Sequence, residues 1–184
     1  MALTSGLVPL RTPAPTFDLP DTSGKRHQLS DYDDQVLVVA FVCNHCPYVR
    51  HIESALGQLA STSAAAFVAI CSNDAKNYPE DAPTGLVEQA RRAEWQFPYL
   101  VDAEQDVAHA YGAVCTPDFF VYGPDRKLAY RGAFDAATPS NGEPVNGSLL
   151  RDAIERVILG QPVPEPHRPS MGCGIKWLPG NEPA

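Results

Sequence analysis

Two cysteines, Cys43 and Cys46, are separated by only two residues, in the segment C-N-H-C. At this spacing two thiols can form a disulfide and exchange it with a third thiol through a mixed disulfide. The pair directly follows the apolar run 36–42 (VLVVAFV), and apolar residues at helical spacing continue from it to Ser61. The pattern predicts a buried strand, a turn that carries both cysteines, and a helix.

This predicted turn gives the first cysteine a chemical role. We expect free N–H groups and the positive end of the helix dipole to point at Cys43 and to stabilise its thiolate, the nucleophile of disulfide exchange. Cys46 would then resolve the mixed disulfide. His45, as a cation or a donor, would favour the Cys43 thiolate further, although a histidine here is also typical of an exposed position. The expected catalytic residues are Cys43, Cys46 and His45.

A metal site is the alternative for the same residues. Zinc commonly takes four ligands, often from two Cys-x-x-Cys pairs, whereas this chain contains one such pair. We therefore favour redox chemistry and expect neither a metal nor an organic cofactor. A metal carrier built from Cys43, His45 and Cys46 stays as an alternative.

The composition limits the function classes. The chain has 184 residues, of which 44% are hydrophobic and 20% charged, which is typical of one globular domain. Its net charge of −8 disfavours nucleic acid and anionic membranes as partners, and no apolar run reaches the ~18 residues of a membrane span. Five cysteines, an odd number, do not suggest a secreted disulfide framework. With no signal peptide recognisable at the N-terminus, we expect a cytoplasmic protein.

The remaining elements must position the cysteines. Hydrophobic patterns and turn residues predict a helix-on-sheet α/β fold with a mixed sheet. The expected elements are a hairpin within 16–32, strands at 67–71 and 98–101, helices at 85–95 and 104–111, a hairpin of 118–122 with 128–131, and a helix at 148–159 capped by Ser148. We expect an N-terminal arm at 1–15, one domain at 16–160, and a Pro-rich tail at 161–184 that packs on it.

The C-N-H-C pair and the step Thr116-Pro117 before DFFVY resemble the thioredoxin-like superfamily. This resemblance implies that the Thr116-Pro117 bond is cis, that it faces the cysteine pair, and that backbone groups of Thr116 bind an extended substrate. More narrowly, the chain resembles the redoxin branch, the alkyl hydroperoxide reductase/thiol-specific antioxidant group. The motifs are APTFDLPDTSGK, FVCNHCPYV, SNDAKNYPEDAP, YGAVCTPDFFVY, YRGAFD and PSMGCGIKW.

The resemblance implies a thioredoxin-like fold and a thiol–disulfide oxidoreductase. Its partners would be protein or small-molecule disulfides and thiols, together with an electron donor that the sequence does not identify, in antioxidant and redox-homeostasis roles. The oligomeric state is not implied.

The chain departs from two relatives. Thioredoxin carries a buried Asp on the strand before its cysteines, where this chain has Leu37, so another group must take the Cys46 proton. Glu53 is a candidate, although a solvated helix charge is the simpler interpretation. Peroxiredoxins carry Pro-x-x-x-Thr/Ser-x-x-Cys, and counting back from either cysteine does not give this motif. A thiol-dependent peroxidase with Cys43 as its reactive thiol is therefore the alternative function.

Other residues could join the site. Cys115 precedes the Thr116-Pro117 step and could be a third redox thiol or a packed residue, whereas Cys71 is expected in the core. Asn73 and Asp74 follow a strand at the sheet edge where α/β folds build sites. Other expectations are an Arg131–Asp135 ion pair, packing roles for Trp95 and Trp177, and no metal binding by His27, His51 or His109.

The tail carries the last cysteine. Ile175 and Trp177 gain by burial, so we expect the tail to pack along the domain although its prolines disfavour a regular element. Cys173 lies between two glycines, which permit a sharp turn or a close approach to another surface. Cys173 could reach the Cys43–Cys46 pair as a resolving or relay thiol, or it could fill a buried gap.

Overall fold

The computed structural model describes residues 2–6 and 8–183, and a five-stranded mixed sheet lies at its centre. The strand order is β6-β5-β4-β8-β9, with β4 parallel to β5, β5 parallel to β6, and the other two pairs antiparallel. The strands are β4 (Leu37–Phe41), β5 (Ala66–Cys71), β6 (Tyr99–Val101), β8 (Asp118–Tyr122) and β9 (Leu128–Gly132). Strand β4 is buried throughout, as its apolar run predicts.

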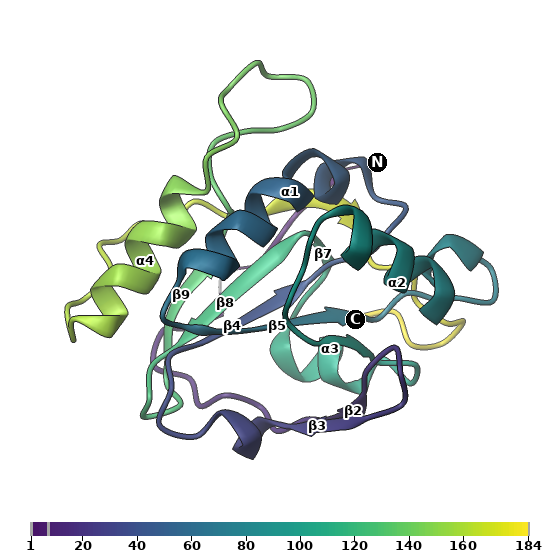
Figure 1. Cartoon of the computed structure of the whole chain (residues 1–184), viewed down its shortest axis with the longest axis horizontal. Helices are drawn as coiled ribbons and strands as arrows, with labels where there is room; N and C mark the ends of the chain where they lie inside the picture. The colour runs from purple at the N-terminus through teal and green to yellow at the C-terminus, as the bar shows by residue number, and fades with distance from the viewer. Residues whose placement is uncertain (1, 7, 184) are drawn as a thin grey trace.

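Helices cover both faces of this sheet (Figure 1). They are α1 (Pro47–Thr62), α2 (Pro83–Arg92), α3 (Asp106–Tyr111) and α4 (Ser148–Ile158). Because side chains alternate along a strand, Val38 of β4 joins the core under α1, α2 and α4. Phe41 points to the other face, where its ring centroid lies 5.5 Å from that of Tyr111 in α3. The expected α/β fold with a mixed sheet is confirmed.

The start of α4 differs from the expectation. Its N-cap is Gly147, at φ 63°, and not Ser148, which is the first helical residue. A Cβ atom at position 147 would lie 2.6 Å from the Phe134 ring. The left-handed backbone and the close ring both require glycine there.

A hairpin of β2 (Asp18–Pro20) and β3 (Arg26–Gln28) lies next to the face that α3 covers. Two 3₁₀ turns follow in the sequence, Leu29–Tyr32 and Pro79–Asp81. No helix in the described part of the chain is long and apolar enough to cross a membrane.

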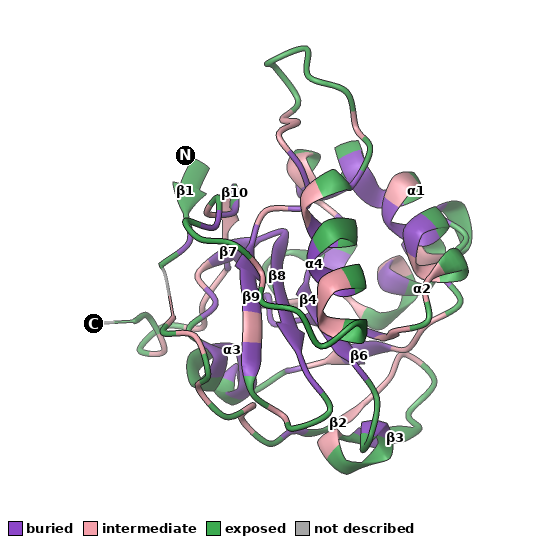
Figure 2. Cartoon of the chain, turned by 90° about the vertical axis from the view of Figure 1, so that its left-hand side faces the viewer, coloured by how far each residue is buried: buried purple, intermediate pink, exposed green. Residues whose placement is uncertain are grey.

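A second small sheet joins both ends of the chain to the site. Its order is β1 (Ala2–Thr4), β10 (Met171–Gly174) and β7 (Cys115–Thr116), all antiparallel. The expectation that the Pro-rich tail forms no regular element is wrong, because β10 falls between its prolines, where every backbone N–H is free to pair. Figure 2 shows β1 and β10 beside β7 at one side of the mostly buried central strands.

Candidate redox site

The first helix begins at Pro47, and this decides which cysteine lies at its N-terminus. The N-cap residue is Cys46, and Pro47 occupies the first helical position, where its missing N–H costs nothing. The backbone N–H of Val49, in the first turn, favours the Cys46 thiolate, although the Cys46 side chain forms no capping hydrogen bond with the helix. The expectation that the helix points at Cys43 is wrong, since Cys43 lies three residues before the N-cap.

The surroundings of the two thiols favour ionisation of Cys46 over Cys43. The neighbouring Cys43 and Cys173 thiols and the N–H groups of Val49 and Cys173 lower the pKa of Cys46 to about 5 despite burial. The neighbouring Cys46 sulfur, together with burial and the negative charge of Asp81, raises the pKa of Cys43 well above its ordinary value. Both residues have 0% exposure.

Thr116 and Pro117 lie against both thiols. Their peptide bond is cis, as the resemblance implies, and Glu165-Pro166 is a second cis bond. The Thr116 carbonyl accepts a 3.2 Å hydrogen bond from the Cys46 thiol, a bond that is lost when Cys46 ionises. The Thr116 hydroxyl lies 3.3 Å from the Cys43 sulfur. The Thr116 backbone is already paired with β10, so the expected strand pairing with an extended substrate is not open there.

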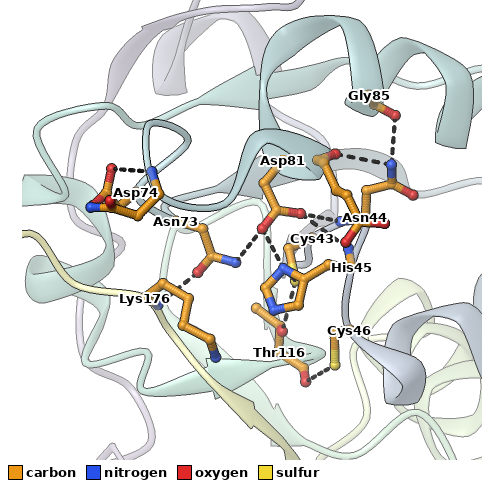
Figure 3. Close-up of polar contacts among 12 residues, drawn as sticks. Cys43, Asn44, His45, Cys46, Asn73, Asp74, Asp81, Gly85, Thr116 and Lys176 are labelled. Atoms are coloured by element: carbon orange, nitrogen blue, oxygen red, sulfur yellow. Dashed lines mark hydrogen bonds and ion pairs between the residues drawn. The ribbon is translucent and has the colours of Figure 1, made fainter.

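Asp81, in the 3₁₀ turn Pro79–Asp81, accepts hydrogen bonds from the backbone of the cysteine turn (Figure 3). One carboxylate oxygen accepts the N–H groups of Asn44 at 2.8 Å and His45 at 3.1 Å. The other accepts from Asn73 at 2.9 Å and from His45 Nδ1 at 2.5 Å. Burial alone would raise the pKa of Asp81, but the bonds from His45 and Asn73 outweigh it and hold that pKa below its ordinary value. Asp81 thus carries a charge inside the protein, fixed by four donors.

His45 contacts Asp81 more closely than Cys43. Its ring is 20° from parallel to that of Tyr78, at 5.3 Å between centroids, and Nδ1 lies 3.9 Å from the Cys43 sulfur. The single Nδ1 proton goes to the 2.5 Å bond with Asp81. Its support of Cys43 is therefore weak in this geometry.

The metal alternative takes a different form in the structure. Cys43, His45 and Asp81 place possible ligand atoms within 4.8 Å of one another, whereas the sequence suggested Cys46 as the third ligand. Both Asp81 oxygens are saturated by N–H donors, two of them from the backbone. A metal would have to displace these bonds, so the donor set does not fit a resident ion.

Glu53 is not a solvated helix charge. Its side chain is buried and forms two hydrogen bonds with Arg92, of 2.7 and 2.9 Å. Gln89 donates to Glu53 at 3.2 Å and to the Cys43 carbonyl at 3.1 Å. Arg92 also donates to the Asn44 side chain at 3.0 Å. This network anchors the cysteine turn to α1 and α2.

The tail brings Cys173 to the thiols. The Cα register of β10 places Cys173 opposite Thr116, whose carbonyl contacts the Cys46 thiol, and Cys173 packs against the core cluster that contains both thiols. Cys173 is half-buried, so it is not a fully buried filler. Its close approach depends on Gly172, as expected from the glycines, but the backbone runs as a strand and not as a sharp turn.

Cys115 and Cys71 are fully enclosed. Both lie in strands, and burial raises the pKa of each thiol far above its ordinary value. Packing is thus the role that their surroundings favour. Asn73 links the site to the tail, since its side-chain oxygen accepts the Lys176 N–H at 2.8 Å, while Asp74 donates its N–H to the Lys176 carbonyl.

Several expectations outside the site have clear outcomes. Arg131 and Asp135 do not pair: Arg131 contacts His167 at 2.9 Å, and Asp135 accepts the N–H groups of Ala137, Asn146 and Gly147. Trp95 is buried in the core, while Trp177 packs half-buried on His109. The group that could hold a metal in the described part of the chain includes none of His27, His51 and His109.

The sequence analysis does not single out Asp81, which lies in the 3₁₀ turn Pro79–Asp81, or Asp118, which follows Pro117 as the first residue of β8. For the start of α1 the sequence did carry a signal: a proline directly after Cys46 favours the first helical position, which makes Cys46 the N-cap.

The strand order and the cysteine turn define an α/β fold of the thioredoxin-like class. Residues 10–131 match the family model of the AhpC/TSA family, and the chain belongs to this family. The match and the fold support an oxidoreductase of the redoxin type at the level of the family.

Solved structures give the same fold. An uncharacterized conserved protein from Geobacillus kaustophilus is 44% identical, covers 98% of each chain and has a TM-score of 0.95. A hypothetical protein from Sinorhizobium meliloti 1021 is 43% identical over 96% of this chain and 99% of its own, with a TM-score of 0.93. A secreted disulfide oxidoreductase from Mycobacterium tuberculosis, described as homologous to E. coli DsbE, shares the fold at 18% identity, over 76% and 94% of the chains, with a TM-score of 0.61. A search of curated proteins finds no match.

Proposed function

We propose that the protein is a thiol–disulfide oxidoreductase that uses Cys43 and Cys46 as its redox pair. The observation that carries the proposal is that both sulfurs lie against Thr116 where α1 begins, at 3.3 Å from its hydroxyl and 3.2 Å from its carbonyl oxygen, and that the pKa of Cys46 is lowered to about 5 there. An acidic thiol next to a second thiol can attack a disulfide and then be released from the resulting mixed disulfide.

In this mechanism Cys46 is the nucleophile. Its thiolate attacks one sulfur of a substrate disulfide, so a bond to Cys46 forms and one substrate thiolate leaves. Cys43 then attacks the Cys46 sulfur, the second substrate thiolate leaves, and Cys43 and Cys46 remain joined by a disulfide. The substrate gains two electrons and two protons. Thr116 and Pro117 form the wall on which both sulfurs rest, and His45 with Asp81 holds the turn.

The substrate is a small disulfide in this proposal. Both sulfurs belong to residues with 0% exposure, and β10 occupies the strand edge at Thr116. An extended polypeptide therefore has neither an exposed sulfur nor a free edge to bind.

The pH profile of alkylation tests the assignment. The reduced protein is treated with iodoacetamide between pH 4 and pH 9, and the labelled cysteine is identified by mass spectrometry. Cys46 should be labelled first, with a midpoint near pH 5 and not near the ~8.5 of a free thiol. Labelling of Cys43 before Cys46 would contradict the assigned roles.

The activity of variants is the second test. Cys46→Ser should reduce the rate of 2-hydroxyethyl disulfide reduction at least 100-fold, whereas Cys115→Ala should leave it unchanged.

A thiol-dependent peroxidase is the second candidate. The observation that favours it is the same buried, acidic Cys46, which a peroxide is small enough to reach. In this case Cys46 replaces Cys43 as the reactive thiol. Consumption of hydrogen peroxide with dithiothreitol, compared between the wild type and Cys46→Ser, separates the two candidates.

A further inference from the structure

The tail occupies the strand edge that faces the thiols. Strand β10 pairs antiparallel with β7, so that Cys173 lies opposite Thr116 and Gly174 opposite Cys115. Thr116 is also the residue whose carbonyl contacts the Cys46 sulfur. A cysteine of this chain thus lies at the position where an added substrate strand would place its own cysteine.

This pairing is a built feature of the fold. A Cβ atom at Gly172 would lie 1.8 Å from the Thr116 carbonyl oxygen, so only glycine permits the approach. The tail is fixed on both sides of β10: the Ser170 carbonyl accepts the N–H of Ser5 at 2.9 Å, and the N–H of Lys176 donates to Asn73 at 2.8 Å. Cys173 is therefore held at the site permanently.

Three thiols meet there, and they differ in access. The Cys43 and Cys46 sulfurs both contact Thr116, Cys173 lies opposite Thr116 in β10, and Cys173 packs against the core cluster that contains Cys43 and Cys46. Cys43 and Cys46 are fully buried, whereas Cys173 is half-buried. A disulfide between Cys43 and Cys46 thus gives an external thiol less access than a disulfide between Cys46 and Cys173, which includes one half-buried residue.

We propose that Cys173 is a relay thiol that moves the disulfide from the buried Cys43–Cys46 pair to a Cys46–Cys173 bond, where an external dithiol reduces it. The inference rests on the proposed function, because the oxidised Cys43–Cys46 pair is its starting point. In this proposal the electron donor is a dithiol, and it reacts with the protein at the tail.

Each step of the relay balances. The Cys173 thiolate attacks the Cys46 sulfur, the Cys46–Cys173 bond forms, the Cys43–Cys46 bond breaks, and Cys43 leaves as a thiolate that takes up the proton lost by Cys173. No electrons are gained or lost. The external dithiol then attacks the Cys173 sulfur, and Cys46 leaves as its thiolate. The second thiol of the dithiol releases Cys173, so the dithiol becomes a disulfide and the protein gains two electrons.

The charges around Cys173 favour this order. Burial and the bond to Cys46 raise the pKa of Cys173 to about 12 while Cys46 is ionised. When Cys46 is bonded in a disulfide, its negative charge is gone and no longer raises the pKa of Cys173. The positive charge of Lys176 then favours the Cys173 thiolate. Conversely, the low pKa of Cys46 makes it the better leaving group in the last step.

Disulfide mapping tests the relay in the full chain. The Cys43→Ser variant is oxidised with 2-hydroxyethyl disulfide, quenched in acid and digested without reductant. Mass spectrometry should find a Cys46–Cys173 disulfide as the main product, and adding Cys115→Ala should not change it. With Cys173→Ser added to Cys43→Ser, the reaction should stop at a hydroxyethyl adduct on Cys46.

The outcomes separate the relay from the proposed function. An adduct on Cys46 that never passes to Cys173 in Cys43→Ser overturns the relay and leaves the proposed function intact. The absence of any adduct or disulfide on Cys46, in the wild type as well, overturns the proposed function. As a second measurement, oxidised Cys173→Ser, which keeps the redox pair, should be reduced by dithiothreitol at least tenfold more slowly than the wild type. An unchanged rate also overturns the relay.

Discussion

Asp81, beside the cysteine turn, and Asp118, directly after Pro117 in β8, are both only 1% exposed, yet their surroundings favour opposite charge states. Asp81 accepts four hydrogen bonds, and its pKa lies below the ordinary value. Asp118 has one oxygen without a hydrogen-bond partner, as has the Ser170 hydroxyl, and burial raises the pKa of Asp118 to about 7 although nearby donors, among them the Phe119 N–H, oppose the rise.

The comparison shows that burial alone does not decide the charge of a carboxyl group. The turn side of the site surrounds its carboxylate with N–H donors, two of them from the backbone of the C-N-H-C segment itself. The strand side, where the tail packs, leaves one Asp118 oxygen without a donor. The number of donors to the ionised form therefore separates the two regions.

The largest effect should come from removing the charge of Asp81. Asp81→Asn should lower the free energy of unfolding at pH 7 by about 3 kcal/mol, because an amide keeps one acceptor oxygen and turns an NH₂ group toward donors. Urea unfolding measures this change. Glu80→Gln, at a neighbouring exposed residue, is the matched control and should change stability by less than ~0.5 kcal/mol.

The pH dependence of the same variant sharpens this prediction. The folded-state pKa of Asp81 lies below 3.8, so its stabilising contribution is fully present above pH 3.8 and is lost as the pH falls through the folded value. The difference between Asp81→Asn and the wild type should therefore narrow only below pH 3.8. Equal stabilities at pH 7 would contradict the charged, four-donor description of Asp81.

The opposite sign is expected for Asp118. Its pKa rises from 3.8 to about 7 on folding, so between these values the folded state keeps a proton that the unfolded state has lost, and stability falls as the pH rises. Asp118→Asn should remove this cost and raise the free energy of unfolding at pH 8 by roughly 2 kcal/mol, part of the ~4 kcal/mol that the rise in pKa represents. Thermal unfolding at pH 8 and pH 3.5 measures it, with no gain expected at pH 3.5. A loss of stability at pH 8 would mean that Asp118 is a stabilised anion like Asp81.

The smallest effect should come from the residue that connects the turn to the tail. Asn73→Ala removes one donor to Asp81 and the acceptor of the Lys176 N–H, and should lower the free energy of unfolding by about 1 kcal/mol. Hydrogen exchange at the Lys176 amide should become faster. Asn77→Ala is the control, because the Asn77 side chain bonds only within its own loop, to Asp74. Unchanged exchange at Lys176 would show that the tail does not depend on this link.

Local sequence patterns were sufficient for most elements. The run 36–42 is buried and β-branched, and it forms β4 because such a run is stable between two helix layers. The apolar spacing after Cys46 produced α1 for the same reason. Strand β10 could not be predicted, because Met171–Gly174 contains no β-branched residue and forms a strand only through the backbone groups of β1 and β7.

The sequence by itself determined the fold class and the place of the Cys43–Cys46 segment between a strand and a helix, because hydrophobic period and cysteine spacing act between neighbours in the chain. The tertiary structure alone decided which groups surround each thiol, that Asp81 fixes the turn, and that Cys173 lies opposite Thr116. A pKa depends on the donors and charges that reach a group in space, and a strand pairing depends on which edge is free. Both are set by segments far apart in the sequence, whose contacts exist only once the chain has folded.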